Sequence, residues 1–205
     1  MRTAIWAGTA VAAICGVIGF TVWKVYLDVP ENAFAQCNGG ASSAAIGGPF
    51  ELVNAQGETV TDKDVITEPT LLYFGYTFCP DVCPLDTVRN AEATEILAER
   101  GYDVTPVFIS VDPARDTPEA VGDFAANISD KLIGLTGSSE QVEAASKAYR
   151  TYYKAHTDDD PDYYLVDHST FTYLTFPDTG FAGFFRRELS GEQLADEVQC
   201  FLDAG

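Results

Sequence analysis

The stretch Thr70–Pro84, which reads TLLYFGYTFCPDVCP, decides the fold of this chain. Its first part, Thr70–Tyr76, is a continuous apolar and aromatic run of the kind that forms a fully buried strand. Cys79 and Cys83 follow, and Pro84 stands where a helix is expected to begin, because proline is favoured at the first helical position. The stretch therefore predicts a buried strand, a turn that carries two cysteines, and a helix.

Strands and helices are predicted to alternate through the rest of the domain. The sequence favours a hairpin at 51–60, further strands at 104–111, 132–135, 163–167, 171–176 and 181–185, and helices that begin at Pro84, Thr117, Ser138 and Ser190. This order predicts an α/β fold, a three-layer sandwich with a mixed sheet. Because the cysteine pair lies between the first buried strand and its helix, where a thioredoxin-like fold carries its chemistry, we expect a fold of that type.

Apolar spacing predicts which side of two helices packs on the sheet. In the helix after the cysteines the expected buried stripe is Leu85, Val88, Ala93, Ile96 and Leu97. In the helix that begins at Ser138 it is Val142, Ala145, Tyr149 and Tyr152. The aromatic residues around the cysteines, Tyr73, Tyr76 and Phe78, are interpreted as core.

Residues 1–27 are predicted to be a membrane anchor. Thr3–Trp23 carries no charge, and about 20 helical residues cross a hydrocarbon core of roughly 30 Å. Trp6 and Trp23 flank this run, as expected at membrane interfaces. A cleaved signal peptide is the alternative, because Ala33–Ala35 looks like a cleavage site.

Residues 28–48, which include Pro30 and a run of small residues, are predicted to be a tether, and 49–205 the folded domain. Cys37 lies in this tether and Cys200 in the last predicted helix. In an oxidising compartment such a spare pair suggests a disulfide, and two free or intermolecular thiols are the alternative.

The formal net charge is −19, from 31 acidic and 12 basic residues. A charge of this sign excludes nucleic acid as a partner, because phosphate backbones attract basic proteins. It favours basic partners or a saline medium, or it serves solubility alone.

Cys79 and Cys83 are the candidate chemical centre. Pro80 and Pro84 disfavour helical backbone in the residue before each of them, so both cysteines are expected ahead of the helix. Cys83 would then lie at the N-terminal end of the helix dipole, which lowers a thiol pKa and favours thiolate. The three residues between the cysteines give a roomier loop than the usual spacer of redox thiols, and a disulfide across it is also feasible.

His168, in the sequence YLVDHS at Tyr164–Ser169, favours a metal site. A redox dithiol needs no distant histidine, whereas two thiolates and one imidazole form the soft, low-coordinate set that copper prefers. Zinc is an alternative metal for the same ligands. His156, in a segment followed by aspartates, is interpreted as an exposed loop residue outside the site.

Three blocks of the sequence together resemble the Sco/SenC family of copper proteins. They are CPDVCP at Cys79–Pro84, SVDPARDTPE at Ser110–Glu119 and VDHS at Val166–Ser169, and they occur in the family's order. The resemblance covers the domain from about residue 46 to 203. It implies a thioredoxin-like copper-binding domain.

The resemblance also implies a function. Cys79, Cys83 and His168 would bind copper, as Cu(I) and as Cu(II). The protein would be held in the inner membrane by one helix, with its domain facing the periplasm, or the intermembrane space if it is mitochondrial. It would help to assemble the binuclear copper site of cytochrome c oxidase subunit II, with other copper chaperones as further partners.

Several functions stay open at this point. A copper-delivery protein is a binding protein and not an enzyme, and it requires His168. A thiol–disulfide reductase that keeps oxidase cysteines reduced requires only Cys79 and Cys83, which would then be catalytic. A peroxidase is suggested by Thr77 and Cys79, although their spacing fits poorly, and a copper or redox sensor is neither favoured nor excluded.

Further charged residues are candidates for the surroundings of the site. Asp81, inside the cysteine loop, is either a charge beside the ligands or a turn-forming residue. Asp112 and Arg115 either line the rim of the site or stabilise their own loop in an ion-pair cluster with Asp116.

Overall fold

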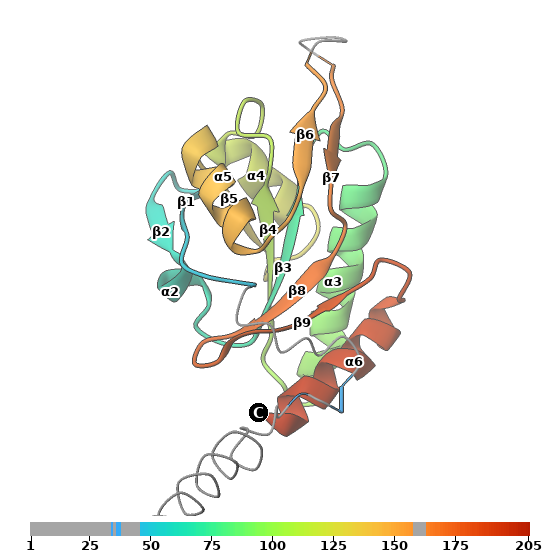
Figure 1. The fold of residues 1–205 in the computed structure, drawn as a ribbon. Helices are drawn as coiled ribbons and strands as arrows, with labels where there is room; N and C mark the ends of the chain where they lie inside the picture. The colour runs from blue at the N-terminus through green and yellow to red at the C-terminus, as the bar shows by residue number, and fades with distance from the viewer. Residues whose placement is uncertain (1–33, 35, 38–45, 158–162) are drawn as a thin grey trace, which may run out of the picture. The chain divides into compact units, whose positions relative to one another are not determined.

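A seven-stranded mixed sheet is the centre of the fold, with the strand order β2-β1-β5-β4-β3-β8-β9 (Figure 1). The computed structural model of this 205-residue chain describes residues 34, 36, 37, 46–157 and 163–205. In the sheet, β3, β4 and β5 are parallel neighbours, and the other pairs are antiparallel. The strands are β1 (Glu51–Asn54), β2 (Thr59–Thr61), β3 (Thr70–Gly75), β4 (Thr105–Ser110), β5 (Ile133–Thr136), β8 (Thr172–Phe176) and β9 (Gly180–Phe185).

Helices cover both faces of the sheet. They are α2 (Asp62–Val65), α3 (Val82–Glu99), α4 (Pro118–Ala126), α5 (Ser139–Ala148) and α6 (Gly191–Ala204). Gly75 of β3 faces α3, because a Cβ added there would lie 3.1 Å from the sulfur of Cys83. Phe74 faces the other side, where its ring centroid lies 5.6 Å from that of Tyr149 at the end of α5. The predicted three-layer α/β sandwich with a mixed sheet is confirmed, with the cysteine loop between β3 and α3.

The last three helices begin where the sequence predicts. The Thr117 hydroxyl accepts a hydrogen bond from the backbone N–H of Ala120 at the start of α4. Ser138 and Ser190 form capping boxes at the starts of α5 and α6, in which a glutamine three residues later bonds back to the serine backbone.

The start of α3 differs from the prediction, since the helix begins at Val82 and not at Pro84. Proline is tolerated in a first turn because the N–H groups there have no partner within the helix. Cys83 is therefore helical, and the prediction that it lies ahead of the helix is wrong. The predicted stripe is also wrong at its start, because Leu85 and Val88 are 59% and 50% exposed.

The segment that carries His168 forms a separate two-stranded ribbon, of which the sequence predicts the second strand but not the first. β6 (Tyr153–Ala155) pairs antiparallel with β7 (Val166–His168), and His168 lies opposite Tyr153. A strand was expected at 163–167, so the histidine closes the strand instead of following it. Figure 1 shows the ribbon beside the N-terminal end of α3.

The predicted buried stripe of α5 does not reach Tyr152, because the helix ends before that residue. Arg150, just beyond the helix, has a φ of 52°, the left-handed conformation that commonly ends helices. The chain then turns into β6, so Tyr152 lies outside the helix and is 58% exposed, contrary to the prediction. Tyr149, by contrast, is buried as predicted.

The predicted anchor, residues 1–27, and most of the predicted tether lie outside the described residues. Within the part of the chain that the structure describes, no helix has the length and apolar character to cross a membrane. Cys37 is described, and it forms a disulfide with Cys200 of α6. The predicted pairing of these two cysteines is confirmed.

Candidate metal centre

The structure brings together the three residues that the sequence singles out as ligands. Cys79 and Cys83 come from the β3–α3 connection and the first turn of α3, and His168 from the end of β7. Their ligand atoms all lie within 4.8 Å of one another, and the Cys83 sulfur is 3.2 Å from Nε2 of His168. Both cysteines are free thiols and are buried. One metal ion is therefore within reach of two sulfurs and one nitrogen.

The first turn of α3 acts on Cys79, not on Cys83 as predicted. The backbone N–H of Cys83, unpaired within the helix, donates to the Cys79 sulfur over 3.2 Å. The pKa of the Cys79 thiol is lowered, first by a hydrogen bond with the Cys83 side chain and, against the opposing effect of burial, by bonds with His168 and with the backbone of Cys83 and Asp81. Cys79 is therefore the residue that is held as a thiolate.

Cys83 has the opposite character. Burial raises the pKa of its thiol, and the hydrogen bond to the neighbouring Cys79 sulfur raises it further. Its side chain is fully enclosed, whereas Cys79 is 9% exposed. The expectation that the helix dipole makes Cys83 the thiolate is wrong, because desolvation outweighs the dipole at a buried sulfur.

The imidazole of His168 is oriented so that one nitrogen faces the sulfurs. Nδ1 lies 3.0 Å from the carbonyl oxygen of Ser169, which can only accept, so Nδ1 carries the proton. Nε2, the other ring nitrogen, faces the sulfurs and lies 3.2 Å from that of Cys83. The rings of Tyr73 and Tyr76 meet the imidazole edge-on, with centroids 6.1 Å and 5.8 Å away. These contacts fix the orientation of the imidazole, with Nε2 on the side of the two sulfurs.

A buried polar network, which was not predicted from the sequence, lies beneath Cys83. The Tyr73 hydroxyl donates to Asp86 over 3.0 Å, and Arg89 forms an ion pair with the same carboxylate at 3.5 Å. Burial raises the pKa of Asp86 although the charge of Arg89 opposes this. A helical period counted from Cys83 would have found it, because Cys83, Asp86, Thr87 and Asn90 share one face.

The loop after β4 lies against the cysteine loop. Asp116 accepts hydrogen bonds from the backbone and the hydroxyl of Thr77, and from Ser110. Asp112 pairs with Arg115, with 2.6 Å between Oδ2 and Nε. The predicted ion pair with Asp116 is wrong, because Arg115 pairs with Asp112, whereas Asp116 accepts hydrogen bonds from Thr77 and Ser110.

The remaining candidates are placed as follows. Tyr73 and Tyr76 are buried as predicted, whereas Phe78 is 56% exposed, so its assignment to the core is wrong. Asp81 is exposed at the N-cap position of α3, and its side chain makes no cap hydrogen bond. His156 lies outside the group of ligands and is paired with Asp167 at 2.8 Å.

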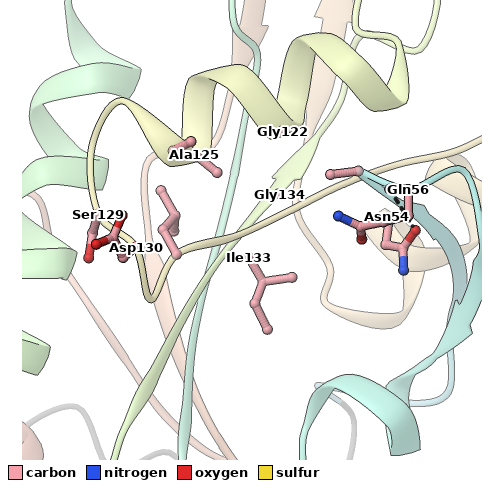
Figure 2. A pocket seen from close by; sticks show the side chains of 11 residues that line it. Asn54, Gln56, Gly122, Ala125, Ser129, Asp130, Ile133 and Gly134 are labelled. Atoms are coloured by element: carbon pink, nitrogen blue, oxygen red, sulfur yellow. Dashed lines mark hydrogen bonds between the residues drawn. The ribbon is translucent and has the colours of Figure 1, made fainter.

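A surface pocket of about 310 Å³ lies apart from the three ligand residues, none of which lines it (Figure 2). Figure 2 shows Asn54 and Gln56 at one end, Ser129 and Asp130 at the other, and Gly122 of α4 above. The pocket offers no sulfur or imidazole, so it does not belong to the metal centre.

Comparison with known proteins gives a consistent result. The SCO1/SenC family model matches residues 38–203. Protein SenC of Rhodobacter capsulatus is 54% identical over 197 residues, which are 95% of this chain and 89% of that protein. The mitochondrial SCO1 homolog 1 of Arabidopsis thaliana is 43% identical over 83% of this chain, which spans about half (52%) of that protein. The crystal structure of Arabidopsis thaliana ScoI with copper bound has a TM-score of 0.72 and 42% identity, and the match covers 78% of this chain and 99% of that one.

Proposed function

The chain belongs to the SCO1/SenC family, and from this premise we propose that it is a membrane-tethered copper chaperone for the binuclear copper site of cytochrome c oxidase subunit II. Copper is its cargo, held by Cys79, Cys83 and His168. Residues 1–27 anchor it in the inner membrane, and its domain works in the periplasm, or in the intermembrane space of a mitochondrion.

The observation that carries this proposal is the convergence of two sulfurs and one imidazole nitrogen within 4.8 Å. Soft thiolates select Cu(I), and a neutral imidazole completes a low-coordinate site. The buried surroundings of Cys83 exclude water from one side, which favours the soft, weakly hydrated ion. Cu(II) would need a fourth ligand, from water or from the protein that receives it.

Unequal exposure of the ligands supports delivery. Cys79 and His168 are more accessible than Cys83, which is fully enclosed. An incoming cysteine of the target protein therefore reaches the metal from the side of Cys79 and His168. Copper would pass by stepwise exchange of ligands, with Cys83 as the last to release it.

Metal transfer tests the proposal. The full-length chain, loaded anaerobically with Cu(I), is mixed with the metal-free soluble domain of subunit II whose cysteines are already reduced. We expect copper to move to that domain, and the His168→Ala chain to fail as a donor because it does not retain the metal. A target domain that gains copper no faster than from a Cu(I) chelator would contradict delivery.

The unlike thiols favour a second candidate function, a thiol–disulfide reductase. Cys79, with its lowered pKa, is suited to attack a disulfide of the target, forming a mixed disulfide and releasing one target thiolate. Cys83 would then attack Cys79, lose its proton to the medium and release the second target thiolate. The target gains two thiols, and this chain gains a Cys79–Cys83 disulfide.

A target domain with oxidised cysteines distinguishes the two functions. The reductase predicts that metal-free His168→Ala reduces it as well as the natural chain, and that Cys79→Ala does not. If neither chain reduces the oxidised domain, the reductase is excluded and copper delivery is the better supported of the two functions. Equal reduction without any copper transfer would favour the reductase.

A further inference from the structure

The strand that carries His168 is not part of the main sheet. Among the residues that the structure describes, β7 pairs with β6 alone, in a ribbon of its own, whereas the cysteines follow β3 in the centre of the main sheet. The pairing of β8 with β3, at Thr172 and Tyr73, fixes the chain after His168, but no strand pairing among the described residues joins β7 or the residues before it to the cysteine loop. Side-chain contacts must therefore hold that part of the histidine segment against the cysteine loop.

Arg115 lies between these two segments. Its guanidinium carbon is 3.6 Å from the ring centroid of Tyr164, which precedes β7, and 4.8 Å from that of Phe78, which precedes Cys79. Arginine stacks on aromatic rings through its planar, delocalised charge. One side chain thus contacts a residue of the histidine segment and a residue of the cysteine loop.

Asp112 holds this arginine in place. Its carboxylate pairs with Nε of Arg115 at 2.6 Å, and it accepts a hydrogen bond from the Tyr164 hydroxyl at 2.6 Å. Asp112 is buried, and the side chain of Arg115 is 13% exposed. The arginine is therefore held by a carboxylate on the loop after β4 and by three rings, those of Tyr164, Phe78 and, at 5.8 Å, Tyr76.

We propose that Arg115 is a positioning residue that clamps the His168 segment to the cysteine loop, and so sets how well the imidazole joins the two sulfurs around one metal ion. It acts through Phe78, the neighbour of Cys79, and through Tyr164, four residues before His168. The inference rests on the proposed function only for the identity of the metal. The ring of Tyr76, whose centroid lies 5.8 Å from that of His168, supports the same alignment by an edge-on contact.

A thermodynamic cycle on Cu(I) affinity tests this proposal in the reduced full-length chain, with a Cu(I) chelator as competitor. Arg115→Met is expected to weaken binding about tenfold, the lower end of the range for residues that orient metal ligands. The same change in a His168→Ala background is expected to have no further effect, because no imidazole remains to be positioned. A loss that persists without His168 would overturn the clamp and would point to a direct charge effect on the thiolates.

Two variants separate geometry from charge. Arg115→Lys keeps the positive charge but lacks the planar guanidinium, so it is expected to behave like Arg115→Met. Arg100→Met is the matched control, because Arg100 forms an exposed ion pair with Asp196 away from the site. Full affinity in Arg115→Lys would contradict the clamp.

A metal-free measurement keeps this test independent of the proposed function. In NMR spectra of the reduced chain, the nuclear Overhauser effect between the rings of Tyr76 and His168 is expected to weaken in Arg115→Met and to persist in Arg100→Met. If Arg115→Met does not fold, Phe78→Leu replaces it, at a side chain that is 56% exposed, and is expected to show the same loss. An unchanged signal in the folded variant would overturn the clamp. Equal copper affinity of the natural chain and His168→Ala would overturn only the proposed function.

Discussion

Gly75 makes room for the fully buried cysteine of the metal centre. A Cβ there would lie 2.9 Å from the Phe108 ring, 3.0 Å from the Tyr73 ring and 3.1 Å from the Cys83 sulfur. These neighbours are fully buried and have no space to withdraw. We expect Gly75→Ala to lower the free energy of unfolding by about 1–3 kcal/mol, as overpacking does, and to weaken Cu(I) binding by displacing Cys83. Urea denaturation and chelator competition would measure both, and a variant with natural stability and affinity would contradict this role.

The two ligand thiols are predicted to differ in reactivity. The pKa of Cys79 lies below, and that of Cys83 above, the ordinary thiol value. Because its pKa is lowered, Cys79 is already a thiolate at acid pH, and its alkylation rate should change little between about pH 6 and 8. An ordinary thiol, with a pKa of about 8.5, ionises progressively over the same range, so its alkylation rate rises with pH. Mass spectrometry of metal-free protein after brief iodoacetamide treatment would measure each site. Faster modification of Cys83, or a Cys79 rate that rises tenfold per pH unit, would contradict the assignment.

At the scale of elements, the sequence predicts strands and caps better than it predicts burial. The buried strands of the main sheet and the serine caps follow from local chemistry, and they appear within a residue or two of the expected places, whereas β7 begins three residues later than expected. Leu85 and Val88 mislead because hydrophobicity alone assigns them to the core, whereas the buried side of the first turns of α3 carries the polar network below the site, and only later residues such as Ala93 and Leu97 are apolar and buried. His168 was identifiable as a ligand, but β6 was not, because its three residues carry no strong strand signal and it forms by pairing with β7.

The disulfide between Cys37 and Cys200 joins the segment before the domain to α6 across 163 residues of sequence. Closing so long a loop restricts the unfolded chain, and native disulfides typically contribute about 2–4 kcal/mol. We expect the double variant Cys37→Ala and Cys200→Ala to lose stability by that amount in urea denaturation. Its Cu(I) affinity should be unchanged, because neither cysteine is among the ligands. Natural stability in the double variant would show that the disulfide contributes nothing to the fold.

On the scale of the whole molecule, exposed apolar side chains gather in the segments that carry or flank the ligands. Among the described residues, the large exposed ones are Phe78, Leu85, Val88, Tyr152, Tyr163 and Leu165. An otherwise acidic chain, with a net charge of −19, thus presents apolar groups in the segments around its ligand residues, as expected where another protein docks. We expect Leu85→Ser to slow copper transfer to the subunit II domain at unchanged Cu(I) affinity. Stopped-flow transfer rates would test this, and an unaltered rate would exclude Leu85 from the contact.

The central claim is that this one chain holds copper with two sulfurs and one nitrogen from distant segments. Anaerobic Cu(I) competition against a high-affinity chelator, with the natural chain beside His168→Ala, tests it most directly. We predict that the natural chain takes copper from the chelator and that His168→Ala loses at least about 100-fold in affinity, more than the loss of a residue that only orients a ligand. Binding that is equally strong in both chains would contradict the account, because the site would then be a dithiol alone.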